Sequence, residues 1–162
     1  VPVVAGIERF CMGGAVELAA ACSLRGASTD CRVAIPACRF GLVYPLGGLE
    51  RLSRNTHGHF IARLLLTAET LSADEAAAGG LFDLVVDAPV QRAQALADAI
   101  AKNAPLAVQA TQRATRAFRS GPISESDRQA LTVAREQVMA SDDLAEGLAA
   151  QIERRPPNFR GR

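Results

Sequence analysis

A pair of glycines leads directly into a short, alanine-rich segment that carries one acidic residue. Gly13 and Gly14 precede a predicted helix over 15–22, and Glu17 lies in its first turn. Glycine lets the backbone approach a ligand closely, and the first N–H groups of a helix have no partner within it. Such N–H groups, supported by the helix dipole, can bind an oxyanion. Glu17, about one turn away, is placed to move a proton on the same ligand.

Composition and charge exclude several classes of function. Hydrophobic residues make up 49% of the 162 residues and charged residues 22%, with a formal net charge of +1. This balance is typical of a globular core and gives no reason to expect nucleic acid or a membrane as partner. The cysteines at 11, 22, 31 and 38 lack CxxC spacing, which indicates free thiols, no metal site and a cytoplasmic location.

The hydrophobic pattern predicts an α/β first half and a helical second half. Strands are expected at 1–7, 31–35 and 81–86. Helices are expected at 15–22, at 49–66 with a break near 55–58, and after Ser72, where Ser72 and Glu75 fit a capping box. Residues 36–48, rich in proline and glycine, are expected to form a loop. Beyond Pro89, helices are expected to begin at Pro105, after Ser124 and at 142–155.

Several motifs resemble, in order along the chain, those of the enoyl-CoA hydratase/isomerase (crotonase) superfamily. Residues 13–19 resemble its GGG-x-ELA motif, and 40–42 with 47–52 resemble its stretch ending in GG-T-x-RL. Residues 66–76 resemble LTG-x-x-LSA-x-EA, residues 80–85 resemble GLV-x-x-V, and pieces of 141–159 resemble the C-terminal signature. The combination is specific, although each motif alone is weak.

The resemblance implies a crotonase-like spiral of ββα turns followed by a helical region that forms trimers. Members of the superfamily are longer, so the chain, which opens in a strand, is expected to be a C-terminal portion. Residues 1–88 would be the C-terminal part of the crotonase core, and 89–162 the helical oligomerisation region. The first oxyanion donor and much of the adenine pocket would lie in an N-terminal segment that the site needs.

The resemblance also implies the ligand and the roles of individual residues. The ligand would be an acyl-CoA thioester, with no separate cofactor and no metal, bound by a homotrimer or a hexamer (a dimer of trimers). Gly14 matches the second oxyanion donor, and Glu17 matches the first catalytic carboxylate of the hydratases. Gly13, Gly14, Ala37 and Pro45 would line the substrate site. Arg154 would reach the coenzyme A of a neighbouring subunit, or else be a solvated helix-end charge.

Two positions depart from the hydratase pattern. Ala37 stands where hydratases have their second catalytic carboxylate, and Pro45 replaces a glycine that contacts the reacting water. Hydration needs one group for water and one for the α-carbon, and alanine supplies neither. Cys38 is expected to point away as a small buried side chain. Tyr44 is either the substitute proton donor or a packing residue.

These departures leave more than one function open. A single carboxylate beside an oxyanion hole suffices for moving a proton between α and γ carbons, so isomerisation fits better than hydration. The alternative is a non-catalytic acyl-CoA-binding protein. A serine hydrolase is disfavoured because the chain has no Gly-x-Ser-x-Gly elbow. His57 and His59 have ligand-like spacing but no nearby acidic or thiol partner, so no metal site is expected there.

Overall fold

The chain divides into two compact units. The computed structural model describes residues 1–119 and 121–162. One unit is α/β and comprises Val3–Leu96; the other comprises Val1–Pro2 with Ala97–Arg162 and is helical. The α/β and helical halves that the hydrophobic pattern predicts are both present.

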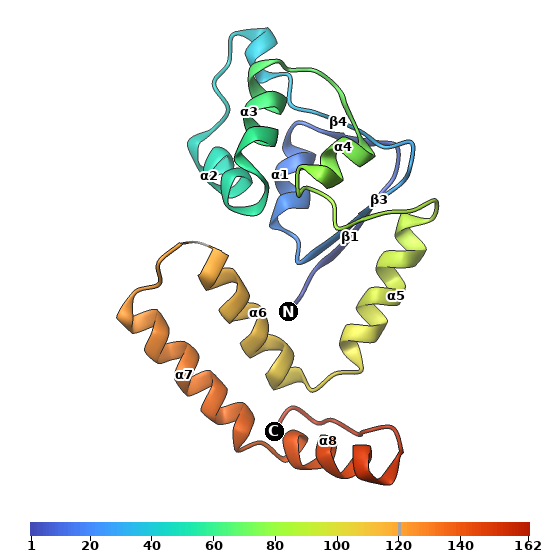
Figure 1. Ribbon diagram of the computed structural model, residues 1–162, viewed down its shortest axis with the longest axis vertical. Helices are drawn as coiled ribbons and strands as arrows, with labels where there is room; N and C mark the ends of the chain where they lie inside the picture. Colours follow the sequence, from blue (N-terminus) through green and yellow to red (C-terminus); the bar gives the residue numbers. More distant parts are fainter. Residues whose placement is uncertain (120) are drawn as a thin grey trace. The chain divides into compact units, whose positions relative to one another are not determined.

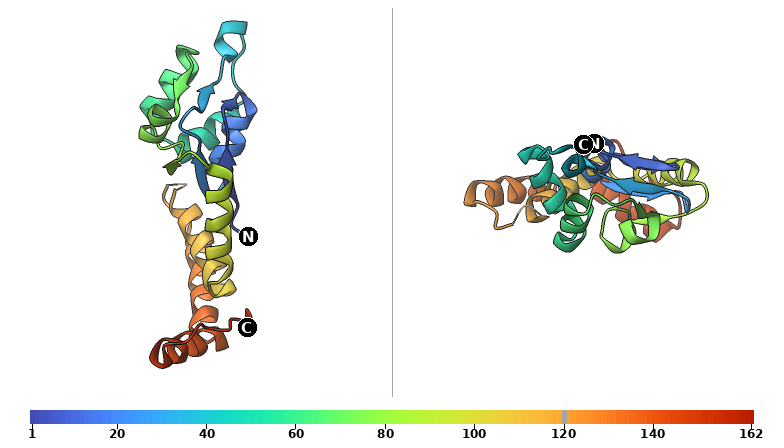
Figure 2. Two further views of the ribbon diagram at one scale, coloured as in Figure 1. Left: turned by 90° about the vertical axis from the view of Figure 1, so that its right-hand side faces the viewer. Right: turned by 90° about the horizontal axis from the view of Figure 1, so that it is seen from above.

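Short strands of the α/β unit form two three-stranded sheets among the described residues (Figures 1 and 2). The first sheet has the order β1-β3-β6 and is parallel throughout, with Ala5 beside Arg25 and Gly26 beside Leu84. The second has the order β2-β4-β5, in which β2 and β4 are parallel and β5 is antiparallel. The bounds are β1 (Val4–Ile7), β2 (Phe10–Met12), β3 (Leu24–Ala27), β4 (Arg32–Ala34), β5 (Leu71–Ser72) and β6 (Leu84–Val85).

Helices follow the strands and enclose a common core. Helix α1 packs against α2 and β2, and α4 packs against β4, β5 and β6 (Figure 1). The core includes Val16 of α1, Leu52 of α2 and Leu64 of α3, all fully buried. The bounds are α1 (Gly14–Ala21), a 3₁₀ helix (Ala37–Phe40), α2 (Leu46–Asn55), α3 (Gly58–Leu66) and α4 (Ala73–Ala78).

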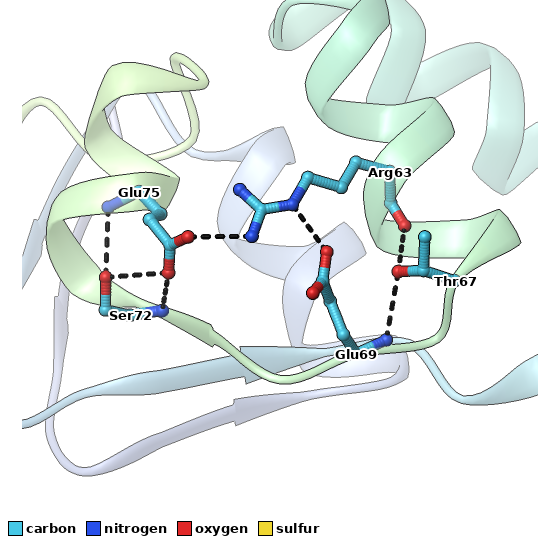
Figure 3. A network of polar contacts seen from close by, with 5 residues as sticks. All are labelled: Arg63, Thr67, Glu69, Ser72 and Glu75. Atoms are coloured by element: carbon cyan, nitrogen blue, oxygen red, sulfur yellow. Dashed lines mark hydrogen bonds and ion pairs between the residues drawn. The ribbon is translucent and has the colours of Figure 1, made fainter.

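A polar network fixes the connection from α3 to α4 (Figure 3). The Ser72 hydroxyl accepts the Glu75 N–H at 3.2 Å, and the Glu75 carboxylate accepts the Ser72 N–H at 2.9 Å. The predicted capping box is therefore confirmed. Arg63, near the end of α3, donates to both Glu75 and Glu69, so one guanidinium joins the capping box to the preceding turn.

The helical unit also begins its helices where the sequence predicts. Pro105 is the first residue of α6, and the Ser124 hydroxyl caps α7 by accepting the Asp127 N–H. Helices α6 and α7 pack side by side (Figure 1). The bounds are α5 (Pro89–Ala101), which begins in the α/β unit, α6 (Pro105–Arg119), α7 (Glu125–Met139) and α8 (Asp142–Glu153).

The strand predictions are less accurate. Strand β1 begins only at Val4, and Val1 is exposed rather than buried. Strands β2, β3 and β5 are not predicted from the sequence, and β3 includes Gly26 and Ala27, which have low strand preference. The loop predicted at 36–48 contains a 3₁₀ helix at Ala37–Phe40, and α2 begins within it at Leu46.

Within residues 1–119 and 121–162, no helix is long and apolar enough to cross a membrane. The four cysteines are free thiols.

Candidate active site

The Gly13-Gly14 turn leaves the start of α1 open. Gly13 has a φ of +56°, which strains any residue with a Cβ, and its N–H donates to the Ala34 carbonyl at 2.8 Å. Because that N–H is occupied, Gly13 is not an oxyanion donor. Gly14 is the first helical residue, no side chain caps the helix, and its N–H has no partner within the helix. Gly14 is exposed, and the space where its Cβ would stand is empty to 4 Å, so a ligand can approach this residue.

The Glu17 carboxylate is held by two donors from outside α1. The Tyr44 hydroxyl donates to Glu17 Oε2 at 3.2 Å, and Arg51 Nε donates to Glu17 Oε1 at 3.1 Å. The Glu17 side chain is 28% exposed and that of Arg51 46%. The structure therefore brings two of the predicted residues, Glu17 and Tyr44, into direct contact.

Gly48 makes room for this contact. It is buried on α2, and a Cβ at this position would lie 2.5 Å from Tyr44 Cε1 and 2.7 Å from Glu17 Oε2. Gly47, its neighbour, would place a Cβ in open space. The second glycine of the Gly47-Gly48 pair is thus required by the approach of Tyr44 and Glu17.

Tyr44 is a protonated phenol at neutral pH. Burial raises its pKa above the ordinary value, and the hydrogen bond to Glu17 and the charge of that carboxylate raise it further. A phenol in this state is a hydrogen-bond donor to the Glu17 carboxylate.

The other predicted substrate-site residues lie on the segment before α2. Ala37 begins the 3₁₀ helix and is half-buried against the core. Pro45 is the residue before α2, and its carbonyl accepts the N–H groups of Gly48 and Leu49 at 2.9 and 3.0 Å. Cys38 is exposed rather than buried, so that prediction is wrong. The cause is the 3₁₀ helix, whose side chains do not alternate as those of a strand do.

Arg154 and the two histidines are placed at helix ends. Arg154 ends α8 with a φ of +53°. His57 precedes α3, His59 is its second residue, and both side chains are exposed. Within the described part of the chain, no group of three or more His, Cys, Asp or Glu side chains is arranged to hold a metal ion.

Arg51 is the residue of this cluster that the sequence reasoning missed. It lies within the GG-x-x-RL stretch, where it was treated as part of a motif without a role. Its spacing from Gly48 was a usable signal, because residues three apart on a helix share a face. Glu17 was predicted to be functional, and a carboxylate that contacts a helix is often paired with a basic side chain. Arg51 is the basic residue on the same face as Gly48.

Comparison with known proteins gives matches along the whole chain. The sequence model of the family described as enoyl-CoA hydratase/isomerase matches residues 1–162. The 2,3-dehydroadipyl-CoA hydratase of Escherichia coli is 30% identical over 99% of this chain and 64% of its own length. The carnitinyl-CoA dehydratase of Proteus mirabilis is 34% identical over the same shares. The chain therefore spans about 64% of the length of these relatives.

A solved structure gives the same result for the fold. The enoyl-CoA hydratase of Mycobacterium tuberculosis superposes with a TM-score of 0.89 at 33% identity, covering 99% of this chain and 64% of that one. The expected α/β spiral with a helical C-terminal region is thereby confirmed.

Proposed function

Because the chain belongs to the enoyl-CoA hydratase/isomerase family, we propose that it binds an acyl-CoA thioester and stabilises the enolate formed from it. The observation that supports this most is the open first turn of α1, with the free approach to Gly14 and the Glu17 carboxylate in the same turn. A thioester enolate carries its negative charge on one oxygen, which fixed N–H donors stabilise. The crotonase fold itself is shared by the whole family and does not select the reaction.

We propose movement of a double bond as the reaction. Glu17 would take a proton from the α-carbon of a 3-enoyl thioester, and the electron pair would move onto the carbonyl oxygen at the Gly14 N–H. The protonated Glu17 would return the proton to the γ-carbon, which leaves the double bond between the α- and β-carbons. One carboxylate suffices for both transfers. Ala37, which has no acid or base, is consistent with this reaction.

The Tyr44 hydroxyl offers the route to hydration. Its bond to Glu17 makes it the available second proton donor near the carboxylate. Hydration at an ordinary rate would therefore assign to Tyr44 the proton transfer that Ala37 cannot perform.

A second candidate function is acyl-CoA binding without catalysis. The observation that favours it is the pair Ala37 and Pro45, which removes a carboxylate and a backbone N–H at the positions where hydratases handle water. Under this candidate a long-chain acyl-CoA binds and no enoyl-CoA is converted.

The Glu17→Gln variant tests the proposal. We expect it to bind acyl-CoA with unchanged affinity and to lose turnover, because the amide accepts no proton from the α-carbon. Glu50→Gln is the matched control, since Glu50 is an exposed carboxylate that pairs with Arg54 on α2. Undiminished turnover in Glu17→Gln contradicts the mechanism, whereas binding without turnover in the unmodified protein supports the second candidate.

We further propose a homotrimer, or a hexamer built from two trimers, with Arg154 directed at the coenzyme A of a neighbouring subunit. Its place at the end of α8, with an exposed side chain, supports this use. Arg154→Ala should raise KM for acyl-CoA and leave kcat unchanged.

A further inference from the structure

Glu17 is restrained by a residue with no role in the mechanism above. Arg51 of α2 binds Glu17 Oε1 through Nε, and Tyr44 binds Oε2. Each carboxylate oxygen thus has its own donor, and the two donors come from opposite sides of Gly48 in the sequence. Because each oxygen has two lone-pair sites, one site on each remains for a substrate proton.

The pairing of Glu17 and Arg51 does not serve stability in any substantial way. Both side chains are partly exposed, at 28% and 46%, and ion pairs in water contribute little to folding. Arg54, three residues further along α2, is exposed to a similar degree as Arg51, at 48%, and pairs with Glu50, which is 59% exposed. The two arginines therefore differ mainly in which carboxylate they hold.

The contact does restrict the direction of the Glu17 side chain. A glutamate has three rotatable side-chain bonds, and a carboxylate at the open edge of a helix samples several rotamers. A proton acceptor must lie within hydrogen-bond reach of the reacting carbon's proton, and small displacements are costly in rate. Two donors at fixed positions on the segment around Gly48 select one orientation of the carboxylate plane.

We propose that Arg51 is a positioning residue, which holds the Glu17 carboxylate in the orientation that proton transfer requires. This inference rests on the proposed function, because it gives Arg51 a task only if Glu17 moves the proton. Arg51 touches neither the substrate nor the reacting atoms in this scheme, and it acts through Glu17 alone.

The test compares Arg51→Met with Arg54→Met in the full chain. Methionine keeps much of the aliphatic stem and removes the donor. We expect kcat for a 3-enoyl-CoA to fall about 10- to 100-fold in Arg51→Met, while KM and the thermal midpoint stay unchanged. Arg54→Met should leave kcat within about twofold of the unmodified protein, since surface changes away from the site have small effects. Arg51→Lys, which keeps a charged donor, should recover part of the lost kcat.

The Glu17→Gln variant, measured beside the Arg51 variants, separates this inference from the proposed function. The inference is overturned if Glu17→Gln loses turnover and both Arg51→Met and Arg51→Lys keep full kcat. It is also overturned if Arg51→Met lowers kcat only in parallel with the thermal midpoint. Full turnover in Glu17→Gln overturns the proposed function, and this inference with it.

Discussion

At the scale of single residues, the candidate site depends on the absence of a side chain at Gly48. Its missing side chain leaves the space in which Tyr44 and Glu17 meet. The motif around Glu17 predicts Gly14 and Glu17 as functional residues, and their roles stay a prediction. The sequence leaves Tyr44 as either a proton donor or a packing residue. Its contact with Glu17 is not predicted, because a contact between residues 27 positions apart depends on tertiary packing.

A methyl group at Gly48 should disturb this contact selectively. We expect Gly48→Ala to lower kcat about tenfold or more, because the new Cβ displaces Tyr44 or the Glu17 carboxylate. Gly47→Ala is the matched control: its Cβ meets nothing within 4 Å, so it should be neutral or stabilise by up to about 1 kcal/mol. Steady-state kinetics and urea unfolding of both variants measure these effects. Equal kcat values for Gly48→Ala and Gly47→Ala would show that activity does not need the space beside Gly48.

The titration of Tyr44 can be followed without interference. The chain has one tyrosine and no tryptophan, so phenolate absorbance reports Tyr44 alone. We expect its pKa to lie above the ordinary value, and to fall part of the way back in Glu17→Gln, since burial remains when the charge is removed. The corresponding stability is present below the ordinary pKa of tyrosine and is lost as pH rises through the raised one. A titration midpoint at the ordinary pKa of tyrosine, unchanged in Glu17→Gln, would contradict the contact between Tyr44 and Glu17.

At the scale of elements, helix ends were more predictable than strands. The caps at Ser72 and Ser124 follow from local hydrogen bonds, which the sequence specifies within four residues. The strands are short and pair with distant segments, so β2 and β3 acquire their structure from tertiary pairing that no local pattern specifies. The 3₁₀ helix at Ala37–Phe40 lies where the sequence predicts a loop.

The capping box at α4 should make stability depend on acid. The Ser72 N–H, Arg63 and the Ser72 hydroxyl lower the pKa of Glu75 to about 2 (Figure 3). Because the folded pKa is lowered, the stabilisation is complete above the ordinary pKa of 4.5 and is lost as pH falls towards 2. We expect Glu75→Gln to lower the urea midpoint at pH 7, with a difference that shrinks below pH 4.5. Asp74→Asn, in the same helical turn, should show a smaller change; equal effects would contradict the assignment.

A buried arginine connects β3 to the chain before β6. Arg25 is 3% exposed and donates to both Asp83 carboxylate oxygens and to the Asn55 carbonyl. Asp83→Ala would leave this charge poorly paired, which should cost about 3 kcal/mol in urea unfolding. Asp87→Ala removes an exposed carboxylate bonded to Thr29, and should cost about 0.5 kcal/mol or less. A small effect at both positions would mean that Arg25 finds another partner.

At the scale of the whole molecule, the α/β unit holds the Glu17 cluster of the candidate site. Gly14, Glu17, Tyr44 and Arg51 all lie within Val3–Leu96, and Arg154 lies in the helical unit. The division of the chain into a core at 1–88 and an oligomerisation region at 89–162 stays a prediction about assembly. Family membership was accessible from the sequence because its motifs recur in order along the whole chain. The reaction was not, because Ala37 removes the residue that would have identified a hydratase.

The central claim is that one carboxylate, Glu17, performs the proton transfers. The most direct measurement follows absorbance of the conjugated enoyl thioester with full-length protein and two substrates, a 3-enoyl-CoA and crotonyl-CoA. We predict that absorbance rises with the 3-enoyl-CoA, that this rise is lost in Glu17→Gln, and that crotonyl-CoA is hydrated slowly or not at all. Rapid loss of crotonyl-CoA absorbance, with no conversion of the 3-enoyl-CoA, would contradict the account.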